Sequence, residues 1–415
     1  MTEHVAIVGG GIIGIASADA LARAGRRVTV IDKGEIAGAC SASNCGYICP
    51  SHVLPLTEPA ALREGLASLL RPRSPLRIRP RLDPAQWRWL LQFARRCRHR
   101  TMLAAGHQLK ALLDLSMAEY GRLLAAEPID CEWNASGLLY VFRTQRAYDA
   151  YAATDELLRC EFGVAAVRLP GEAVREREPA LQPGLAGGFL YEGDASVRPD
   201  RLASGWAESL RRRGVDLQPR VRLVGLDVEG GRVASLRTDA GPLAADAVLF
   251  AAGAESPLLA RHLGMRIPIE PGKGYSVTLP RPPICPTLPM LLPERRVGVS
   301  PFEDGYRIGS MMELAGFDRT IPPHRIAYLR RAVDGYLPAI GEAREQERWF
   351  GWRPMTWDSL PIIGCVPHLA NAYLATGHNM LGLSLAAGTG RLIAELMTGR
   401  PPALDLSPFD PKRFA

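Results

Sequence analysis

The glycine-rich turn GGGIIG constrains the fold of this chain more than any other feature, because it joins an apolar run to a helical one. Residues 5–8 are predicted to form a strand, a helix follows the turn, Gly25 ends that helix, and RVTVID forms a second strand. Gly9, Gly11 and Gly14 then supply the tight turn, the close approach of the backbone to a pyrophosphate, and the close contact of helix with sheet. The pattern predicts dinucleotide binding, with the phosphates at the helix N-terminus.

Asp32 ends the second strand, where a carboxylate is placed to bond the adenosine ribose hydroxyls. The same predicted site includes Ile12 and Ile13, which lie inside the glycine turn, and Lys33, which follows Asp32. An incidental glycine turn is the alternative. The complete order of strand, turn, helix, strand and acid favours dinucleotide binding over it.

The stretch CSASNCGYIC at residues 40–49 follows the second strand and carries three of the eight cysteines. A zinc or iron–sulfur site needs a fourth ligand, and the other five cysteines stand alone without a C-x2-C partner, so we expect no metal. A solvated loop is another interpretation. We instead expect the small polar residues of the stretch to wrap a flat ligand: Ser41, Ser43, Asn44 and Gly46, followed by Tyr47.

Composition sets broad bounds. The 415 residues are 47% hydrophobic, which suits two domains or one large composite domain. The 50 Lys and Arg against 43 Asp and Glu give a charge of +7, which suits an anionic cofactor, an acidic substrate or a membrane surface without choosing among them. The cysteine usage and the first apolar run, which resembles neither a signal peptide nor a membrane span, predict reduced thiols in a cytoplasmic protein.

Further along, helices alternate with strand-rich segments, and no internal repeat is present. Near the carboxyl end, YLATGHNMLGLSLAAGTGRLIAELMTG reads as a strand, a polar turn and a helix, so a second helix N-terminus faces a ligand. The other expected elements are helices at 84–125, 199–213 and 323–337, a strand at 133–142, three short strands and an apolar strand at 221–254, and a strand-rich stretch at 265–313.

These motifs resemble the FAD-dependent D-amino-acid oxidase superfamily, and most closely the bacterial D-amino-acid dehydrogenases, over essentially the whole chain. The motifs are GGGIIG, SASNCG, LFAAGA, PGKGYS, GWRPMTWDSLPIIG and GHNMLG. The resemblance implies an α/β fold, in which a discontinuous Rossmann-like FAD-binding domain joins a substrate domain with a mainly antiparallel sheet. We expect residues 1–80, 195–262 and 346–415 in the first domain, and residues 81–194 and 263–345 in the second.

The resemblance also implies which residues contact FAD. The loop matching SASNCG would lie along the ribityl chain and the ring system, although the family has Ala at the positions of Ser43 and Cys45 and a residue closer to Gln at Tyr47, which leaves substrate preference open. Relatives with covalent flavin attach it through a Cys where this chain has Arg353, so FAD is expected to be non-covalent. The remaining expected contacts are Val221, Ala252, Gly253, Arg353, His378, Met380, Leu381, Gly382 and Leu383.

Arg353 is the first candidate for substrate binding, because a planar guanidinium holds a carboxylate bidentately and fixes its orientation. In the resembling family the arginine of this motif holds the substrate carboxylate over the flavin. Tyr275 would add a hydroxyl to the same carboxylate or lie beside the ring, and His378 would act as an acid–base residue or belong to the flavin environment. A surface arginine and a core tyrosine are the alternatives.

The expected reaction is hydride transfer from the substrate Cα to flavin N5, which gives an imine. The expected substrate is a small D-amino or D-imino acid of the D-proline, cis-4-hydroxy-D-proline or D-alanine type, with Tyr47, Tyr275 and Trp357 as flat walls. Electrons would pass to a respiratory acceptor such as quinone. The alternatives are a glycine or sarcosine oxidase that uses oxygen, and a flavin subunit of a larger electron-transfer complex.

Residues 71–100 hold ten arginines and one acid, with Trp87, Trp89, Leu90 and Phe93 interleaved. Such a stretch fits a helix that covers the core with a solvated basic face, or a basic amphipathic helix on a membrane surface. Nucleic acid would also bind it, but no other feature supports that interpretation, and we expect no nucleic-acid partner. The protein is therefore expected in the cytoplasm, with peripheral contact to the inner membrane face left open.

Overall fold

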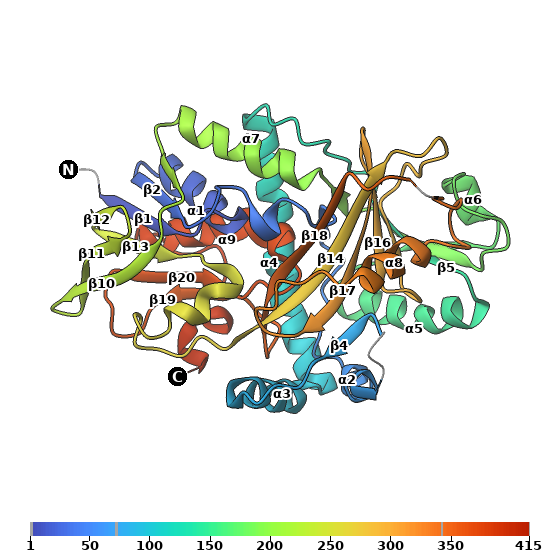
Figure 1. The fold of residues 1–415 in the computed structure, drawn as a ribbon, viewed down its shortest axis with the longest axis horizontal. Helices are drawn as coiled ribbons and strands as arrows, with labels where there is room; N and C mark the ends of the chain where they lie inside the picture. The colour runs from blue at the N-terminus through green and yellow to red at the C-terminus, as the bar shows by residue number, and fades with distance from the viewer. Residues whose placement is uncertain (1–2, 71–73, 342, 415) are drawn as a thin grey trace.

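The computed structural model describes residues 3–70, 74–341 and 343–414, so the first two arginines of the basic stretch, at positions 71 and 73, lie outside the described residues. Its two largest sheets lie side by side (Figure 1). The smaller sheet has six strands in the order β19, β20, β13, β1, β2, β9, all parallel except β19. Their bounds are β1 (His4–Val8), β2 (Arg27–Asp32), β9 (Asp216–Pro219), β13 (Ala247–Phe250), β19 (Ile362–Cys365) and β20 (Ala372–Thr376).

Helices cover one face of this sheet, and a small antiparallel sheet covers the other. The helical layer contains α1 (Ile12–Arg23), α4 (His99–Ala126), α7 (Pro199–Arg212) and α9 (Gly382–Met397). The small sheet consists of β10 (Leu223–Glu229), β11 (Arg232–Thr238) and β12 (Gly241–Ala244). Val233 and Leu236 of β11 share a buried cluster with Val248 and Phe250 of β13, which places this sheet on the face opposite the helices.

The larger sheet has nine strands in the order β18, β14, β17, β16, β15, β5, β7, β6, with β4 beside β17. Their bounds are β4 (Leu76–Ile78), β5 (Leu138–Phe142), β6 (Val167–Pro170), β7 (Gly187–Tyr191), β14 (Ile269–Pro280), β15 (Met290–Leu292), β16 (Val297–Pro301), β17 (Gly305–Leu314) and β18 (Glu347–Thr356). Most neighbours are antiparallel, as expected for the second domain.

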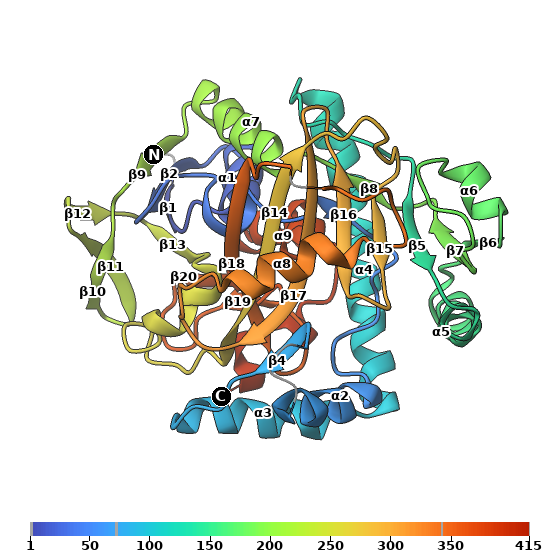
Figure 2. The ribbon, with the colours of Figure 1, turned by 45° about the vertical axis from the view of Figure 1, so that its right-hand side comes forward.

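The remaining elements surround the larger sheet or connect the two parts (Figure 2). The helices are α2 (Pro59–Leu70), α3 (Pro84–Arg96), α5 (Gln145–Phe162), α6 (Ala173–Arg177) and α8 (Pro323–Ala332). A short ribbon of β3 (Tyr47–Ile48) and β8 (Ala195–Ser196) and the 3-10 turns η1 (Ala39–Ser41), η2 (Gly253–Leu259), η3 (Ser407–Phe409) and η4 (Pro411–Phe414) complete the fold.

Local sequence explains several of these boundaries. Asp83 begins α3, because its carboxylate accepts the Ala85 N–H at 3.0 Å and Pro84 fits the first helical position. Thr144 caps α5 in the same way, and Gly163 ends that helix with a φ of 65°. These local residues account for the start of α3 and for both ends of α5.

The predicted α/β class with a mainly antiparallel second sheet is confirmed, while three element predictions need correction. The helix expected at 84–125 is two helices, because Arg98 adopts an extended backbone between α3 and α4. The strand expected at 133–142 begins only at Leu138, and the helix expected at 323–337 ends at Ala332.

The division of the chain into two domains stays a prediction, but strand pairing departs from it at two places. Strands β4 and β18 were expected in the FAD-binding domain, and both pair in the nine-stranded sheet. The physical reason is backbone hydrogen bonding: β18 runs antiparallel to β14 over ten residue pairs, which ties it to the larger sheet along its full length.

Close contact between α1 and α9 gives a testable prediction. A Cβ on Gly390 of α9 would lie 2.4 Å from the Ala16 carbonyl oxygen of α1, so Gly390→Ala forces the helices apart and should lower the free energy of unfolding by about 1–3 kcal/mol. Urea denaturation followed by circular dichroism measures the change. The matched control is Gly121→Ala on exposed helix α4, where nothing lies within 4 Å of the new Cβ and stability should rise by about 0.5–1 kcal/mol. A neutral Gly390→Ala would contradict the helix contact.

Candidate functional site

A cavity of about 1110 Å³ lies where the carboxyl ends of β1, β2, β13 and β20 meet the nine-stranded sheet. It exceeds the range of roughly 300–1,000 Å³ typical of small-ligand sites. Ligands bind at this edge in open α/β sheets. The wall from the larger sheet includes Gly274 and Ser276 of β14, Gly298 of β16, and Gly351 and Arg353 of β18.

The structure brings the predicted cofactor-contact and catalytic residues to this one cavity, with a single exception. The exception is Gly14, whose added Cβ would lie 1.9 Å from the Gly9 carbonyl oxygen, so it serves the contact of helix with strand. The residues that line the cavity are Gly9, Gly11, Ile12, Ile13, Asp32, Lys33, Ser41, Ser43, Asn44, Gly46, Tyr47, Val221, Ala252, Gly253, Tyr275, Arg353, His378, Met380, Leu381, Gly382 and Leu383.

The glycine turn and Asp32 form one end of the cavity. Gly9 has a φ of 116°, and a Cβ there would lie 2.4 Å from the Ala251 carbonyl oxygen, so only glycine fits. The Asp32 carboxylate accepts the Gly10 N–H at 2.8 Å and the Gly34 N–H at 2.7 Å, which fixes its orientation beside the turn. This arrangement suits an adenosine ribose and a pyrophosphate at the start of α1.

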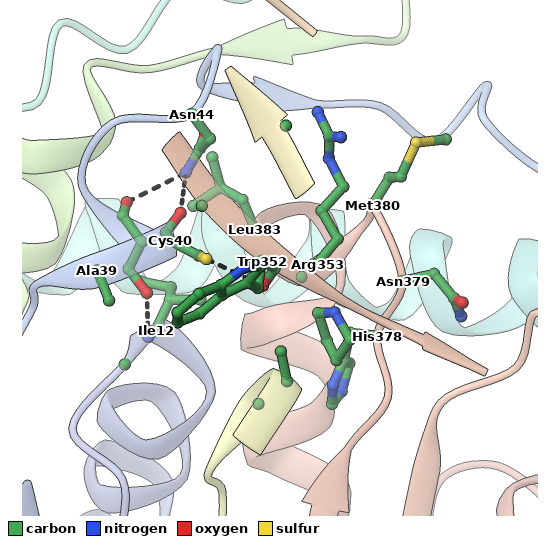
Figure 3. A pocket seen from close by; sticks show the side chains of 18 of the residues that line it. Ile12, Ala39, Cys40, Asn44, Trp352, Arg353, His378, Asn379, Met380 and Leu383 are labelled. Atoms are coloured by element: carbon green, nitrogen blue, oxygen red, sulfur yellow. Dashed lines mark hydrogen bonds between the residues drawn. The ribbon is translucent and has the colours of Figure 1, made fainter. Parts of the chain in front are cut away.

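The loop from Cys40 to Tyr47 lines one wall of the cavity and is held by its own side chains (Figure 3). Asn44 donates from Nδ2 to the carbonyls of Cys40 and Ser41, at 3.0 and 3.1 Å, and accepts the Gly46 N–H at 2.8 Å. Ser41 accepts the Ile12 N–H at 2.8 Å and so tethers the loop to the start of α1. The loop is therefore an ordered wall rather than a solvated segment.

The three cysteines of this stretch are neutral thiols. Burial raises the pKa of Cys40 to about 11 and also raises the pKa of Cys45 and Cys49. Cys40 donates to the Trp352 carbonyl oxygen at 3.0 Å. Throughout the described ranges, no three His, Cys, Asp or Glu side chains gather as a metal site would require. The cysteines thus act as small apolar fillers in the wall.

Arg353 supplies a cation to the opposite wall. It pairs across β18 and β14 with Gly272, and its guanidinium lies over Gly274, where a Cβ would come within 2.5 Å of Nη1. Nη1 donates to the Met311 carbonyl oxygen at 2.6 Å, and no acidic side chain in the described part of the chain pairs with the group. Burial lowers the pKa of the Arg353 guanidinium, which still stays charged near neutral pH.

His378 lies between β20 and α9, on the side of the cavity below Arg353 in the view of Figure 3. Its Nε2 is 3.0 Å from the Thr389 hydroxyl, and desolvation lowers its pKa to about 3. The imidazole is therefore neutral near pH 7, which fits a place in the cofactor environment better than acid–base work. Helix α9 begins at Gly382, directly after this segment, with its N-terminus on the cavity.

Two aromatic residues do not take the predicted places. The Tyr275 hydroxyl donates to Glu313 Oε2 at 2.7 Å, and the ring lies in the cluster on the outer side of the larger sheet, which contradicts the predicted contact with a substrate carboxylate. Trp357 packs against Phe414 at 5.2 Å and does not line the cavity. Tyr47 does line it, with its hydroxyl 3.0 Å from the Met290 carbonyl oxygen.

No motif in the sequence indicated His52 and Tyr140, two residues that meet on the cavity wall. The His52 Nε2 lies 2.6 Å from the Tyr140 hydroxyl, and both side chains line the cavity. Burial lowers the pKa of His52 to about 4. The two residues are 88 positions apart and belong to no recognised motif; His52 lies in the segment after β3 and Tyr140 on β5, so only the tertiary fold brings them together.

These features define a class: a two-part fold with a dinucleotide-type cavity that is lined by the N-termini of α1 and α9. The FAD dependent oxidoreductase (DAO) family model matches residues 4–396, and the chain belongs to this family. FAD is accordingly the cofactor, and the glycine turn, the Asp32 carboxylate and the two helix termini fit it. The resemblance noted from the sequence is confirmed.

Relatives and solved structures agree with this assignment. The chain is 34% identical to a D-amino acid dehydrogenase of Cereibacter sphaeroides, covering 99% of this chain and 95% of the relative. It is 36% identical to a D-amino acid dehydrogenase of Paramagnetospirillum magneticum, covering 99% and 98%. Glycine oxidase from Geobacillus kaustophilus is 25% identical with a TM-score of 0.75, covering 99% and 98% of the two chains. L-proline dehydrogenase from P. horikoshii, 19% identical, shares the fold with a TM-score of 0.77 over 100% and 98%.

Within the described ranges, every helix is too short or too polar to cross a bilayer.

The burial of His378 predicts a loss of stability in acid. Its pKa is about 3 in the folded chain and about 6.5 when exposed, so the contribution to stability is complete above about pH 6.5 and falls as the pH drops toward 3. When the pH is lowered from 7 to 5, the free energy of unfolding should therefore fall in both proteins, but by about 2 kcal/mol less in His378→Gln than in the parent chain. Urea denaturation at the two pH values, with FAD at saturation, measures this difference.

The matched control for that prediction is His99→Gln at the exposed start of α4, which should leave the pH dependence unchanged. Equal pH dependence in the parent chain and in His378→Gln would show that His378 is not held neutral by the fold.

Proposed function

We propose that this chain oxidises a small D-amino or D-imino acid to an imine and passes the electrons to a respiratory acceptor. The candidate substrates are of the D-alanine, D-proline and cis-4-hydroxy-D-proline type. The observation that carries the proposal is the Arg353 guanidinium, which faces the cavity with one donor on the Met311 carbonyl oxygen and without a carboxylate from the described part of the chain. The D-enantiomer is supported by the relatives, which are D-amino acid dehydrogenases.

Arg353 would bind and orient the substrate carboxylate. Its remaining N–H groups form the fork that matches two carboxylate oxygens, and such charge-assisted pairs are strong where water is excluded. Gly274 leaves the guanidinium flat against the β14 backbone, so the group keeps one orientation. When FAD is bound, it supplies hydride acceptance at its N5 position.

The start of α9 would stabilise negative charge on the cofactor. Residues 381–384 line the cavity, and their backbone N–H groups stand at the positive end of the helix. The neutral His378 beside them adds no positive charge near pH 7. The dipole of α9 is thus the main feature at this wall that favours an anion.

A small, uncharged side chain stays our proposal for the substrate, but the walls differ from those expected. Of the three aromatic residues that we predicted as walls, only Tyr47 directs its side chain to the cavity. Trp349 and Trp352 also line the cavity, and we did not predict them. Arg296 and Arg319 also line the cavity, which the motifs did not indicate. A test must therefore include acidic as well as uncharged substrates.

The non-covalent state of FAD is also a proposal. Position 353 carries arginine, and the cysteines at the cavity have raised pKa values, so a thiolate able to bond the flavin is disfavoured.

The direct test is anaerobic mixing of the purified yellow protein with single amino acids while the flavin absorbance is followed. We expect bleaching by D-alanine, D-proline and cis-4-hydroxy-D-proline, and slower bleaching by their L-forms and by D-aspartate. We also expect acid precipitation to leave the flavin in the supernatant. Equal rates with D- and L-forms would refute the stereochemical proposal. Rapid reduction by glycine followed by fast reoxidation in air would favour a glycine oxidase, the activity of the solved relative from Geobacillus kaustophilus.

Replacing the clamp gives a second prediction. Arg353→Lys keeps a positive charge but loses the bidentate fork, so kcat/KM should fall about 100-fold, equivalent to about 2.7 kcal/mol, while FAD stays bound. Steady-state kinetics with a soluble dye as acceptor measure the loss.

Two further variants make the result specific. Gly274→Ala keeps the arginine but displaces its guanidinium, because the new Cβ would lie 2.5 Å from Nη1. This variant should raise KM. Arg348→Lys changes an exposed arginine of the same strand that pairs with Glu345, and it should leave kcat/KM unchanged. An unaltered kcat/KM in Arg353→Lys would remove this residue from the substrate site.

A further inference from the structure

Helices α2 and α3 lie side by side at one end of the molecule, along the bottom of both ribbon views (Figure 1, Figure 2). The outward side chains of α3 follow helical spacing, from Trp87 and Arg88 through Leu91 to Arg95. We call the basal face the surface formed by these four residues with Leu62 of α2 and Leu82, which precedes α3.

The inner side of α3 is already used by the core. Trp89 and Phe93 stack at 5.2 Å, and the Trp89 Nε1 donates to the Met355 carbonyl oxygen of β18 at 3.0 Å. Gln86 is fully buried and bonds the backbone at Arg79 and Arg81. These contacts fix the rotation of the helix, so the residues of the basal face cannot turn inward.

The basal face exposes large apolar side chains. Leu82 is fully exposed, and Trp87 and Leu91 are 49% and 52% exposed. The Trp87 Nε1 is satisfied by the Arg81 carbonyl oxygen at 2.9 Å, so its ring can enter an apolar phase without losing a hydrogen bond. Clustered exposure of this kind marks a contact surface, whereas scattered exposed residues do not.

Arginines surround these apolar side chains. Six exposed arginines lie around α2, α3 and the start of α4, and none has an ion pair with an acid in the described ranges. They are Arg63, Arg79, Arg88, Arg95, Arg98 and Arg100. By contrast, Arg211 and Arg159, exposed on α7 and α5, each pair within their own helix, with Glu208 and Glu156. The positive charge at this end of the molecule is therefore available to an external anion.

We propose that the basal face docks on a bilayer that contains anionic lipid. Trp87, Leu82 and Leu91 enter the boundary between headgroups and acyl chains, while the arginines bind lipid phosphates and keep their charged ends in water. Nucleic acid would satisfy the arginines but gains little from the aliphatic side chains of Leu82 and Leu91, which have no stacking surface. The combination of exposed leucines with unpaired arginines selects a lipid surface.

The docked face would lie close to the substrate cavity. Leu56 lines the cavity and belongs to the same apolar cluster as Leu90 and Phe93 of α3. Met355, which accepts the Trp89 hydrogen bond, stands two residues after Arg353 on β18. An electron acceptor dissolved in the bilayer would therefore approach this wall of the cavity. This inference rests on the proposed function, which supplies the identity of the acceptor.

Vesicle binding tests the docking without turnover, so its failure would leave the substrate assay untouched. The full-length, FAD-loaded protein is mixed with phosphatidylcholine vesicles that contain phosphatidylglycerol, or with phosphatidylcholine alone, and sedimented at low and high salt. We expect binding to the anionic vesicles that weakens with salt. Arg88→Glu with Arg95→Glu should weaken it at least about tenfold, and Trp87→Ser with Leu91→Ser should weaken it at low salt as well.

The charge-matched control is Arg146→Glu with Arg331→Glu, exposed positions on α5 and α8 away from the basal face, which should bind as the parent does. Unchanged FAD content and kcat/KM with a soluble dye acceptor show that each variant is folded. Equal binding to neutral vesicles, no binding to either kind, or equal weakening in the control would overturn the proposal. Retention on duplex DNA without vesicle binding would also overturn it, in favour of nucleic acid.

Discussion

The site depends on the close contact between the loop from Cys40 to Tyr47 and strands of the larger sheet that carry glycine at the points of contact. Added Cβ atoms on three strand glycines would lie between 2.6 and 2.8 Å from atoms of the loop: Gly351 from Cys40, Gly309 from Cys45 and Gly298 from Tyr47. The same loop is tethered to α1 through Ser41 and to α9 through Ser384, whose hydroxyl donates to the Tyr47 carbonyl oxygen at 3.0 Å. One segment thus holds both helix N-termini and the larger sheet at fixed distances around a single cavity.

This contact also explains the electrostatics of the cavity. Burial raises the pKa values of Cys40 and Cys45 and lowers that of Arg353, so the environment disfavours charge of either sign. The guanidinium nevertheless stays protonated, and a buried charge without a partner is unfavourable. A ligand carboxylate would supply the missing countercharge. The wall therefore prefers an acid over a neutral amine of the same shape, even though the Met311 carbonyl oxygen already accepts one hydrogen bond.

The sequence motifs predicted those parts of the site whose position depends only on residues close by in the chain. The glycine turn, Asp32 and the segment from His378 to Leu383 lie at the ends of strands and the starts of helices, where sequence spacing fixes position, and the structure gathers them at one cavity. Tyr275 failed because the face that a strand residue occupies depends on pairing, and β14 turns this side chain toward Glu313. The contact of His52 with Tyr140 was missed because it joins the segment after β3 to strand β5 of the larger sheet, which only the tertiary fold brings together.

The two strands that departed from the expected division, β4 and β18, have a common consequence. Both pair in the nine-stranded sheet, which is therefore continuous from the segment leading into α3 to the strand that carries Arg353. The hydrogen bond from Trp89 to the Met355 carbonyl oxygen closes this connection directly. Because interiors are close-packed, a surface contact made by α3 is transmitted to β18 with little slack. In the proposed function, the orientation of the molecule on a membrane surface and the position of Arg353 would thus be coupled through one sheet.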